Sequence, residues 1–114
     1  MTTAQARGAE AERRAAEYLG RNKLVVIERN FRVRGGELDL ICRDGHTVVF
    51  VEVRQRSRSD YGGAAASITV AKQARLILAA RHWLAAHGEV PCRFDCVLID
   101  GAKLEWIKDA FAAD

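Results

Sequence analysis

The sequence lacks several features that mark particular classes of protein. It has no apolar run near the roughly 18 residues typical of a membrane-spanning helix, and no signal-peptide-like apolar stretch at its start. We therefore expect a cytoplasmic protein with no membrane partner. It also has no internal repeat, low-complexity stretch or linker, so we expect residues 1–114 to form a single domain. With 49% hydrophobic and 29% charged residues, the composition is that of an ordinary globular protein.

Cysteine is also scarce. The three cysteines are an odd number in apolar surroundings, which fits buried, reduced thiols better than a disulfide framework. Cys92 and Cys96 have the same strand parity, but no second Cys or His pair accompanies them, which speaks against structural zinc. His46, His82 and His87 have no partner at ligand spacing, so we expect them to be structural or solvated.

The net charge is modest, at +3 with a pI near 9.0, but the arginines are unevenly placed. They flank an acid-containing segment in the first half of the chain. Arginine makes planar, bidentate contacts with phosphate oxygens, so this placement indicates a polyanionic partner such as nucleic acid. A solubilising surface is the alternative explanation. The arginines are Arg29, Arg32 and Arg34 before the segment and Arg54, Arg56 and Arg58 after it.

Residues 35–54 carry the most informative pattern, two β-strands folded back on each other. Asp44-Gly45 is a hairpin signal with β-branched runs on both sides. If the turn closes with two or four residues, Asp39 faces Phe50, one diagonal step from Glu52 on the same face of the sheet. Side chains in this relation lie roughly 7 Å apart or less at Cβ, close enough for two carboxylates to share one ion.

Such a pair of carboxylates suggests a metal site. Neighbouring carboxylates repel each other unless one is protonated, and a divalent cation removes this conflict. A three-residue turn would instead send Asp39 and Glu52 to opposite faces, and an edge hairpin with solvated acids is a further alternative. The acid face is not simply polar, because it also carries Ile41, Val48 and Phe50, so we expect both faces to be covered. The opposite face is wholly apolar and consists of Leu38, Leu40, Val49, Val51 and Val53.

The remaining pattern predicts an α-β-β-β-α-β-β order and a compact α/β fold with a mixed sheet flanked by helices. The first helix is expected over residues 4–19, with Thr3 as N-cap and Gly20 as its stop. The second is expected from the cap Thr69 to about His87, with Gly88 as its stop. Leu76, Ile77, Ala80 and Leu84 form its predicted buried stripe. Further strands are expected at 24–28, 93–99 and 103–107, a turn-rich arginine segment after 28 and a loop at 55–67.

The first helix adds a third carboxylate. Gly8, Glu12, Ala15 and Leu19 share one helix face made of small and apolar residues, so we expect Glu12 to point toward the sheet. A buried glutamate needs a cation or hydrogen-bond donors. The alternative is a solvated helix surface with exposed ion pairs.

Several motifs together resemble the YraN-like bacterial proteins, from about Gly8 to Phe111. This resemblance implies a member of the restriction-endonuclease-like PD-(D/E)XK superfamily, with the α-β-β-β-α-β core of archaeal Holliday-junction resolvases. It further implies a nuclease-like domain acting on DNA, with branched or damaged DNA as substrate, and, since related resolvases are dimers, a homodimer. The motifs are Gly8-x-x-x-Glu12, Asn30-Phe31-Arg32, Gly36-Glu37-Leu38-Asp39-Leu40-Ile41, Phe50-Val51-Glu52-Val53-Arg54 and Arg93-Phe94-Asp95.

By this resemblance, Glu12 is the helical acid, Asp39 and Glu52 are the ligands in the sheet, and Arg54 occupies the position of the motif lysine. Phosphodiester hydrolysis with Mg²⁺ or Mn²⁺ suits this set, and the Val53 carbonyl is a candidate third ligand. Lys72 and Gln73, in the first turn of the second helix, are candidates for phosphate contact, although ordinary helix-surface positions are the alternative. The predicted nucleic-acid-binding residues are Arg32, Arg34, Arg56, Arg58, Lys72 and Gln73.

Arg54 departs from the motif. Lysine can lose its proton in a desolvated site and help to activate water, whereas arginine stays charged and offers only electrostatic assistance. Three alternatives are open: activity persists because the metal lowers the pKa of the bound water, Lys72 takes the place of the motif lysine in space, or the protein binds nucleic acid without cutting it. A protein–protein adaptor on a nuclease fold is a third class, but the sequence shows no large apolar surface patch for it. Asp95 is part of a motif that carries the resemblance, and we expect it to form hydrogen bonds with arginines across the sheet.

Overall fold

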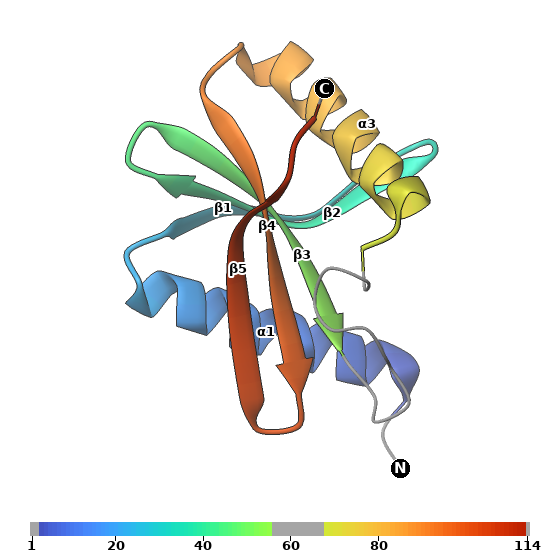
Figure 1. The fold of residues 1–114 in the computed structure, drawn as a ribbon, viewed down its shortest axis with the longest axis vertical. Coiled ribbons are helices and arrows are strands. Elements are labelled where there is room, and N and C mark those ends of the chain that lie inside the picture. Colours follow the sequence, from blue (N-terminus) through green and yellow to red (C-terminus); the bar gives the residue numbers. More distant parts are fainter. Residues whose placement is uncertain (1–2, 56–67, 114) are drawn as a thin grey trace.

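The computed structural model describes residues 3–55 and 68–113 (Figure 1). Its α-β-β-β-α-β-β order confirms the predicted α/β class and is consistent with a restriction-endonuclease-like core. The elements are α1 (Ala4–Arg21), β1 (Val25–Val33), β2 (Gly36–Asp44), β3 (Thr47–Gln55), α3 (Val70–His87), β4 (Cys92–Asp100) and β5 (Lys103–Phe111).

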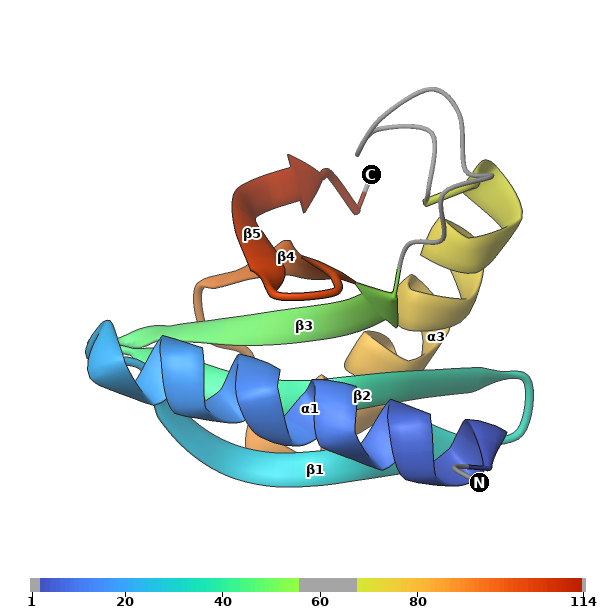
Figure 2. The same ribbon diagram turned by 90° about the horizontal axis from the view of Figure 1, so that it is seen from below.

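The strands form one five-stranded sheet in the order β1-β2-β3-β4-β5. Neighbouring strands are antiparallel except β3 and β4, which are parallel and are joined by the crossover that contains α3. The sheet is therefore mixed, as predicted. The helices α1 and α3 cover opposite faces of the sheet (Figure 2).

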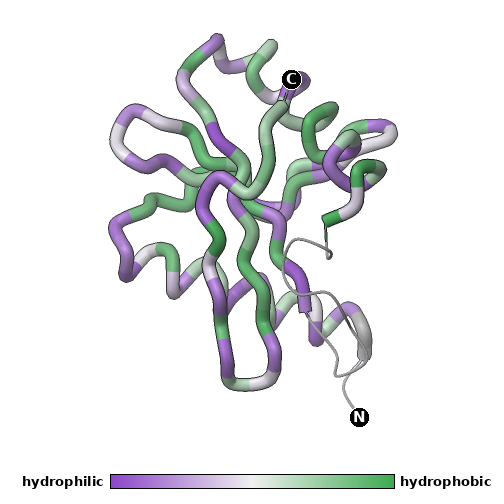
Figure 3. The backbone as a smooth tube through the Cα atoms, in the orientation of Figure 1, coloured by the Kyte–Doolittle hydropathy of each residue, from purple (hydrophilic) through white to green (hydrophobic). Residues whose placement is uncertain are grey.

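The core consists of two layers separated by the sheet. Alternate residues of β3 point to opposite sides, so Phe50 packs under α3 while Val49 and Val51 pack under α1. Hydrophobic residues accordingly follow the inner parts of the strands, and hydrophilic residues lie toward the hairpin ends (Figure 3). The prediction of cover on both faces is confirmed. The prediction that Leu38 and Leu40 share one face was wrong, because Leu38 packs on the α3 side whereas Leu40 packs on the α1 side.

The helix caps follow local sequence signals in most places. Thr3 and Thr69 are the predicted N-caps, and their side chains accept hydrogen bonds from the N–H groups of Ala6 at 3.0 Å and Lys72 at 3.1 Å. Gly88, with φ 99°, caps the C-terminal end of α3 as predicted. No helix in the described ranges is long and apolar enough to cross a membrane.

Gly20 does not end α1, so that prediction was wrong. The helix continues to Arg21, and Lys23 adopts the left-handed conformation (φ 75°) that closes it. Leu24 N–H donates to the Leu19 carbonyl at 3.0 Å, and both side chains lie in the α1-side core. The closure is a Schellman motif, and its position is set by this hydrophobic contact.

Two strands are longer than predicted. β1 does not end at residue 28 in a turn-rich segment but continues to Val33, because its N–H and C=O groups pair with β2 at Arg29 and Phe31. Its ladder is irregular between Val26 and Glu28. β5 likewise continues beyond 107 to Phe111. The exposed arginines of the edge strand β1 give it the composition of a loop, so the end of this strand was predicted too early.

The hairpin register differs from the prediction by two residues. Gly45 (φ 61°) and the residue after it form the turn, and Asp44 stays in the ladder opposite Thr47. Phe50 therefore pairs with Ile41 instead of the predicted Asp39. An even shift does not by itself move a side chain to the other face, so the two acids still share one.

The cysteines in the structure are free. Cys42 and Cys96 are buried as predicted. Cys92 is exposed, so the prediction of a buried thiol was wrong there, because Cys92 is the first residue of β4, at the exposed beginning of the strand.

Candidate acidic site at the ends of β2 and β3

Asp39 and Glu52 lie together where β2 and β3 stop pairing. The ladder extends outward to Leu40 and Val51, and the two acids are the next residues on their strands. Beyond this point Asp39 Oδ2 accepts a hydrogen bond from the Val53 N–H at 2.8 Å, so a side chain replaces the ladder bond. Glu52 is 5% exposed and lies within hydrogen-bonding reach of Asp39. Their role as metal ligands stays a prediction.

Glu12 reaches the same place from α1. Its side chain is partly buried and adjoins Asp39. Burial, and then the charge of Asp39, raise the pKa of Glu12 above its ordinary value. Asn30 opposes this shift, because its amide nitrogen, in the orientation that satisfies both groups, lies 3.2 and 3.3 Å from the carboxylate oxygens. The expected inward orientation of Glu12 is thus observed.

Glu52 is the most deeply buried of the three acids. Burial and the adjacent carboxyl group of Asp39 raise the pKa of Glu52 to about 8. Lys72 opposes this rise, with Nζ 3.4 Å from Oε2 of Glu52. The cluster therefore holds more negative charge than its surroundings compensate, which favours a bound cation or a retained proton.

The start of α3 brings Lys72 to this site. The Thr69 cap fixes the first turn, and Lys72 Nζ also lies 3.9 Å from Glu37, which in turn is 3.6 Å from Arg32. Gly36 permits the approach of β2 to α3, since a Cβ there would lie 2.5 Å from the Arg75 carbonyl oxygen. Glu37 therefore lies between two basic residues, Lys72 and Arg32.

The remaining predicted site residues lie around this cluster or have other contacts. Arg34 is exposed in the β1–β2 turn, and Arg54 is partly buried on β3, where its charge lowers the pKa of Cys96 against the larger effect of burial. Gln73 donates to the Ile68 carbonyl at 3.2 Å and thereby supports the helix start. Arg56 and Arg58 lie outside the described residues.

The donor set fits a hard divalent cation in chemistry. Asp39 and Glu52 offer carboxylate oxygens, the ligands that Mg²⁺ and Mn²⁺ prefer, and Mg²⁺ keeps several waters with only one or two carboxylates bound. Within residues 3–55 and 68–113, no three His, Cys, Asp or Glu side chains are arranged to hold one ion. A site here would therefore use two carboxylates, water and a backbone oxygen such as the predicted Val53 carbonyl.

Asp95 has a structural environment. It is 1% exposed and accepts hydrogen bonds from Arg93 at 3.0 Å, from the Trp106 indole at 2.9 Å and from the Asp109 N–H at 2.9 Å. The arginine partner, Arg93, lies on the same strand as Asp95 and not across the sheet as expected. The partners from across the sheet are Trp106 and Asp109 of β5. These bonds hold the irregular end of β5, where Asp109 has φ 52°.

Comparison with known proteins places the chain in a family. The model of Uncharacterised protein family UPF0102 matches residues 11–99, which include all three clustered acids and Lys72. The chain belongs to the UPF0102 family. A UPF0102 protein of Dechloromonas aromatica is 67% identical over 112 residues, covering 98% of this chain and 93% of the relative. A relative from Nitrosomonas europaea is 56% identical, and the match covers 97% of this chain and 98% of the relative. One from Cupriavidus taiwanensis is 58% identical, and the match covers 96% of this chain and 86% of the relative. The YraN-like resemblance is confirmed.

Sequence reasoning missed Asn30 as a partner of the acids in this UPF0102 protein. Asn30 has φ 53°, a left-handed conformation that asparagine tolerates better than most residues, and this directs its amide to Glu12. Its signal was an asparagine, a poor strand former, inside a segment that pairs as a strand. The Glu37–Lys72 pair had no local signal, because it joins a strand to a helix far along the chain.

Proposed function

We propose that this UPF0102 protein is a divalent-metal-dependent endonuclease that hydrolyses DNA phosphodiester bonds, with branched or damaged DNA as substrate. One observation carries the proposal: Glu12, Asp39 and Glu52 converge from three elements on one place, with Lys72 beside them. A cluster of under-compensated carboxylates next to basic residues suits a metal and a phosphodiester together.

The residues have distinct roles in this proposal. Asp39 and Glu52 would hold the cation, and the Val53 N–H keeps the Asp39 carboxylate in place at 2.8 Å. A bound Mg²⁺ or Mn²⁺ would offset charge on the scissile phosphate and lower the pKa of a coordinated water. Glu12, oriented by Asn30, would accept a proton or a hydrogen bond from that water.

The basic residues bind the polyanion. In the free protein the Lys72 ammonium lies 3.4 Å from Glu52 and compensates the charge of its carboxylate. Once a bound cation compensates Glu52 instead, the Lys72 ammonium is free to contact a phosphate oxygen. Arg54 contributes positive charge without proton transfer, and exposed Arg32 and Arg34 contact neighbouring phosphates.

A non-catalytic nucleic-acid-binding protein on the same fold is the second candidate. Two observations favour it: Arg54 stands where the motif has lysine, and in the described ranges no three acid, His or Cys side chains form a ready metal cluster. In this case the same basic residues bind DNA, and the acids only retain protons.

A cleavage assay distinguishes the two candidates. Linear, nicked and four-way DNA are incubated with Mg²⁺, Mn²⁺ or a chelator and with wild type, Asp39→Asn, Glu52→Gln or the control Glu17→Gln. Glu17 is an exposed acid of α1 paired with Arg13, so its change removes the same charge away from the cluster. We expect metal-dependent cleavage by wild type and control, reduced at least about 100-fold in the two cluster variants with DNA binding retained.

Each other outcome has a defined meaning. Salt-sensitive DNA binding without cleavage, not restored by Arg54→Lys, supports the binding protein instead. Absence of DNA binding even at low salt contradicts both candidates.

A further inference from the structure

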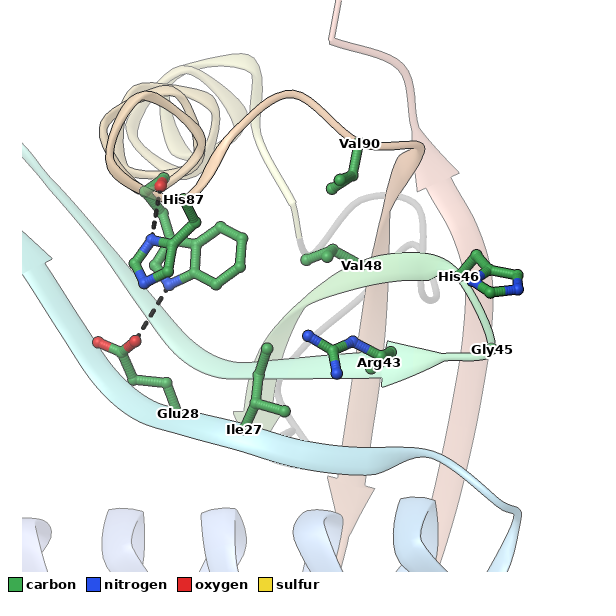
Figure 4. A pocket seen from close by; sticks show the side chains of 9 residues that line it. Ile27, Glu28, Arg43, Gly45, His46, Val48, His87 and Val90 are labelled. Carbon is green, nitrogen blue, oxygen red and sulfur yellow. Dashed lines mark hydrogen bonds between the residues drawn. The ribbon is translucent and has the colours of Figure 1, made fainter.

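A cavity lies at the end of α3 away from the acidic site. It has a volume of about 530 Å³ and opens between the C-terminal end of α3, the strands β1 and β2 and the β2–β3 hairpin (Figure 4). It shares no residue with the acidic site, because Lys72 lies in the first turn of α3 and this cavity adjoins its last. Its lining includes Ile27, Glu28, Arg43, Val48, Trp83 and His87.

One wall is a fixed aromatic surface. The His87 ring stacks on the buried Trp83 indole, with 3.9 Å between centroids and 9° between planes. His87 Nδ1 lies 2.8 Å from the Trp83 carbonyl oxygen. A carbonyl only accepts, so Nδ1 must carry the proton and donate it, which fixes the tautomer and the ring orientation. The exposed His87 ring thus offers a flat, oriented surface on which another ring can stack.

Two charged groups flank this surface. Glu28 Oε1 accepts from the Trp83 indole N–H at 3.0 Å, while its other oxygen has no hydrogen-bond partner in the described parts of the chain. Arg43 is exposed and makes no ion pair with any described residue. Figure 4 shows its guanidinium directed into the cavity toward the Glu28 side, whereas the His46 ring points away.

We propose that this cavity binds a single nucleotide unit, with the base against the aromatic wall of Trp83 and His87, base N–H groups on the second oxygen of Glu28 and a phosphate on Arg43. An aromatic ring and a carboxylate acceptor are complementary to a base, and the exposed guanidinium is complementary to a phosphate. Ligand cavities of about 300–1,000 Å³ are typical for molecules of this size. The apolar side chains of Ile27 and Val48 complete the floor. This site is independent of the proposed nuclease.

The carboxylate favours particular bases. Guanine presents an N–H and an amino group side by side, and the second oxygen of Glu28 can accept from both. Uracil presents one N–H between two carbonyl oxygens, and these repel Glu28. We therefore expect guanosine monophosphate (GMP) to bind more tightly than uridine monophosphate (UMP).

A ¹⁵N NMR titration with GMP, UMP, guanosine and inorganic phosphate tests this site. The Trp83 indole N–H reports on the cavity, and the Trp106 indole, which bonds Asp95, is an internal control. GMP is expected to shift the Trp83 signal saturably, more tightly than guanosine or phosphate alone, and to leave Trp106 unchanged. Asp39→Asn is expected to bind GMP as wild type does, since it alters only the acidic site.

Three variants separate the three contacts. His87→Ala removes the aromatic surface and Arg43→Gln removes the charge-assisted bond to phosphate. Each is expected to weaken GMP binding at least about tenfold. Glu28→Gln keeps an acceptor for Trp83 and is expected to abolish the preference for GMP over UMP. His82→Ala, an exposed histidine of the same helix outside the cavity, is the matched control and leaves binding unchanged. Thermal unfolding checks that each variant is folded.

The nucleotide has two possible sources, a free mononucleotide or one unit of a strand. If a guanine-containing tetranucleotide binds at least tenfold more tightly than both GMP and an all-thymine tetranucleotide, the ligand is one unit of a strand. If the guanine-containing tetranucleotide and GMP bind with equal affinity, the ligand is the free nucleotide. The proposal is overturned if no guanine compound moves the Trp83 signal at millimolar concentration. It is also overturned if UMP and phosphate match GMP, or if folded His87→Ala binds as wild type does.

Discussion

Lys72 Nζ lies 3.4 Å from Oε2 of the buried Glu52, a contact between the first turn of α3 and the second half of β3. The contact places a lysine ammonium at the acidic cluster although the motif position on β3 is occupied by Arg54. In the proposed nuclease this ammonium compensates the carboxylate in the free protein and is available to phosphate in the complex. The electrostatic balance of the site therefore depends on α3 as much as on the hairpin.

The Lys72–Glu52 pair is tested by Lys72→Gln. Loss of the nearby positive charge is expected to raise the pKa of Glu52 further, because burial and Asp39 already disfavour its ionised form. The measurement is a ¹³C NMR titration of the Glu52 carboxyl group. Arg75→Gln, an exposed cation of the same helix, is the control and should leave this pKa unchanged. An unaltered Glu52 titration in Lys72→Gln would contradict the contact.

The metal-free protein is expected to lose stability as pH rises. The pKa of Glu52 is raised from 4.5 to about 8 in the folded protein, so the folded state binds this proton more tightly than the unfolded state. Its contribution is fully present below pH 4.5 and is lost as pH rises through about 8. Urea unfolding between pH 5 and 9 measures this, and Glu52→Gln should flatten the profile. A wild-type profile that rises over this interval would be inconsistent with the buried acid pair.

The packing of β2 against α3 is tested by Gly36→Ala. The added Cβ would lie 2.5 Å from the Arg75 carbonyl oxygen, so β2 and α3 must separate. We expect a loss of about 1–3 kcal/mol in the free energy of unfolding and a weaker Lys72–Glu52 contact. Gly8→Ala is the matched control, because a Cβ there meets no atom within 4 Å, and alanine should stabilise α1 by up to about 1 kcal/mol. Equal stabilities of the two variants would show that the close approach is absent.

Asp95 is expected to support the fold and not the chemistry. Asp95→Asn removes the charge that faces Arg93 and turns an amide toward the donors of Trp106 or Asp109. We expect the free energy of unfolding to fall by about 2–4 kcal/mol, as measured in urea, with DNA binding retained below the unfolding temperature. Selective loss of DNA binding in a variant as stable as wild type would instead assign Asp95 to the site.

Features that depend on local chemistry could be predicted from the sequence. Thr69 and Gly88 delimit α3 because cap residues act on the adjacent turn. The shared face of Asp39 and Glu52 was predictable although the register was two residues off, because parity survives an even shift.

Features that depend on tertiary contacts could not be predicted. The end of α1 depends on the packing of Leu24 on the core, and Lys72 reaches Glu52 only through the α3 crossover. The position of the turn after Asp44 is likewise undetermined by an Asp-Gly pair alone. Nothing local joins His87 on α3 to Glu28 on β1, so the cavity between them had no sequence signal.

The most direct test of the acidic site is Mn²⁺ binding measured by titration calorimetry and electron paramagnetic resonance. We expect wild type and Glu17→Gln to bind one ion per chain, more tightly as pH rises through about 8 and Glu52 releases its proton. Asp39→Asn and Glu52→Gln should lose this binding while remaining folded. Absence of Mn²⁺ uptake by wild type, or uptake unchanged in both variants, would contradict the metal site.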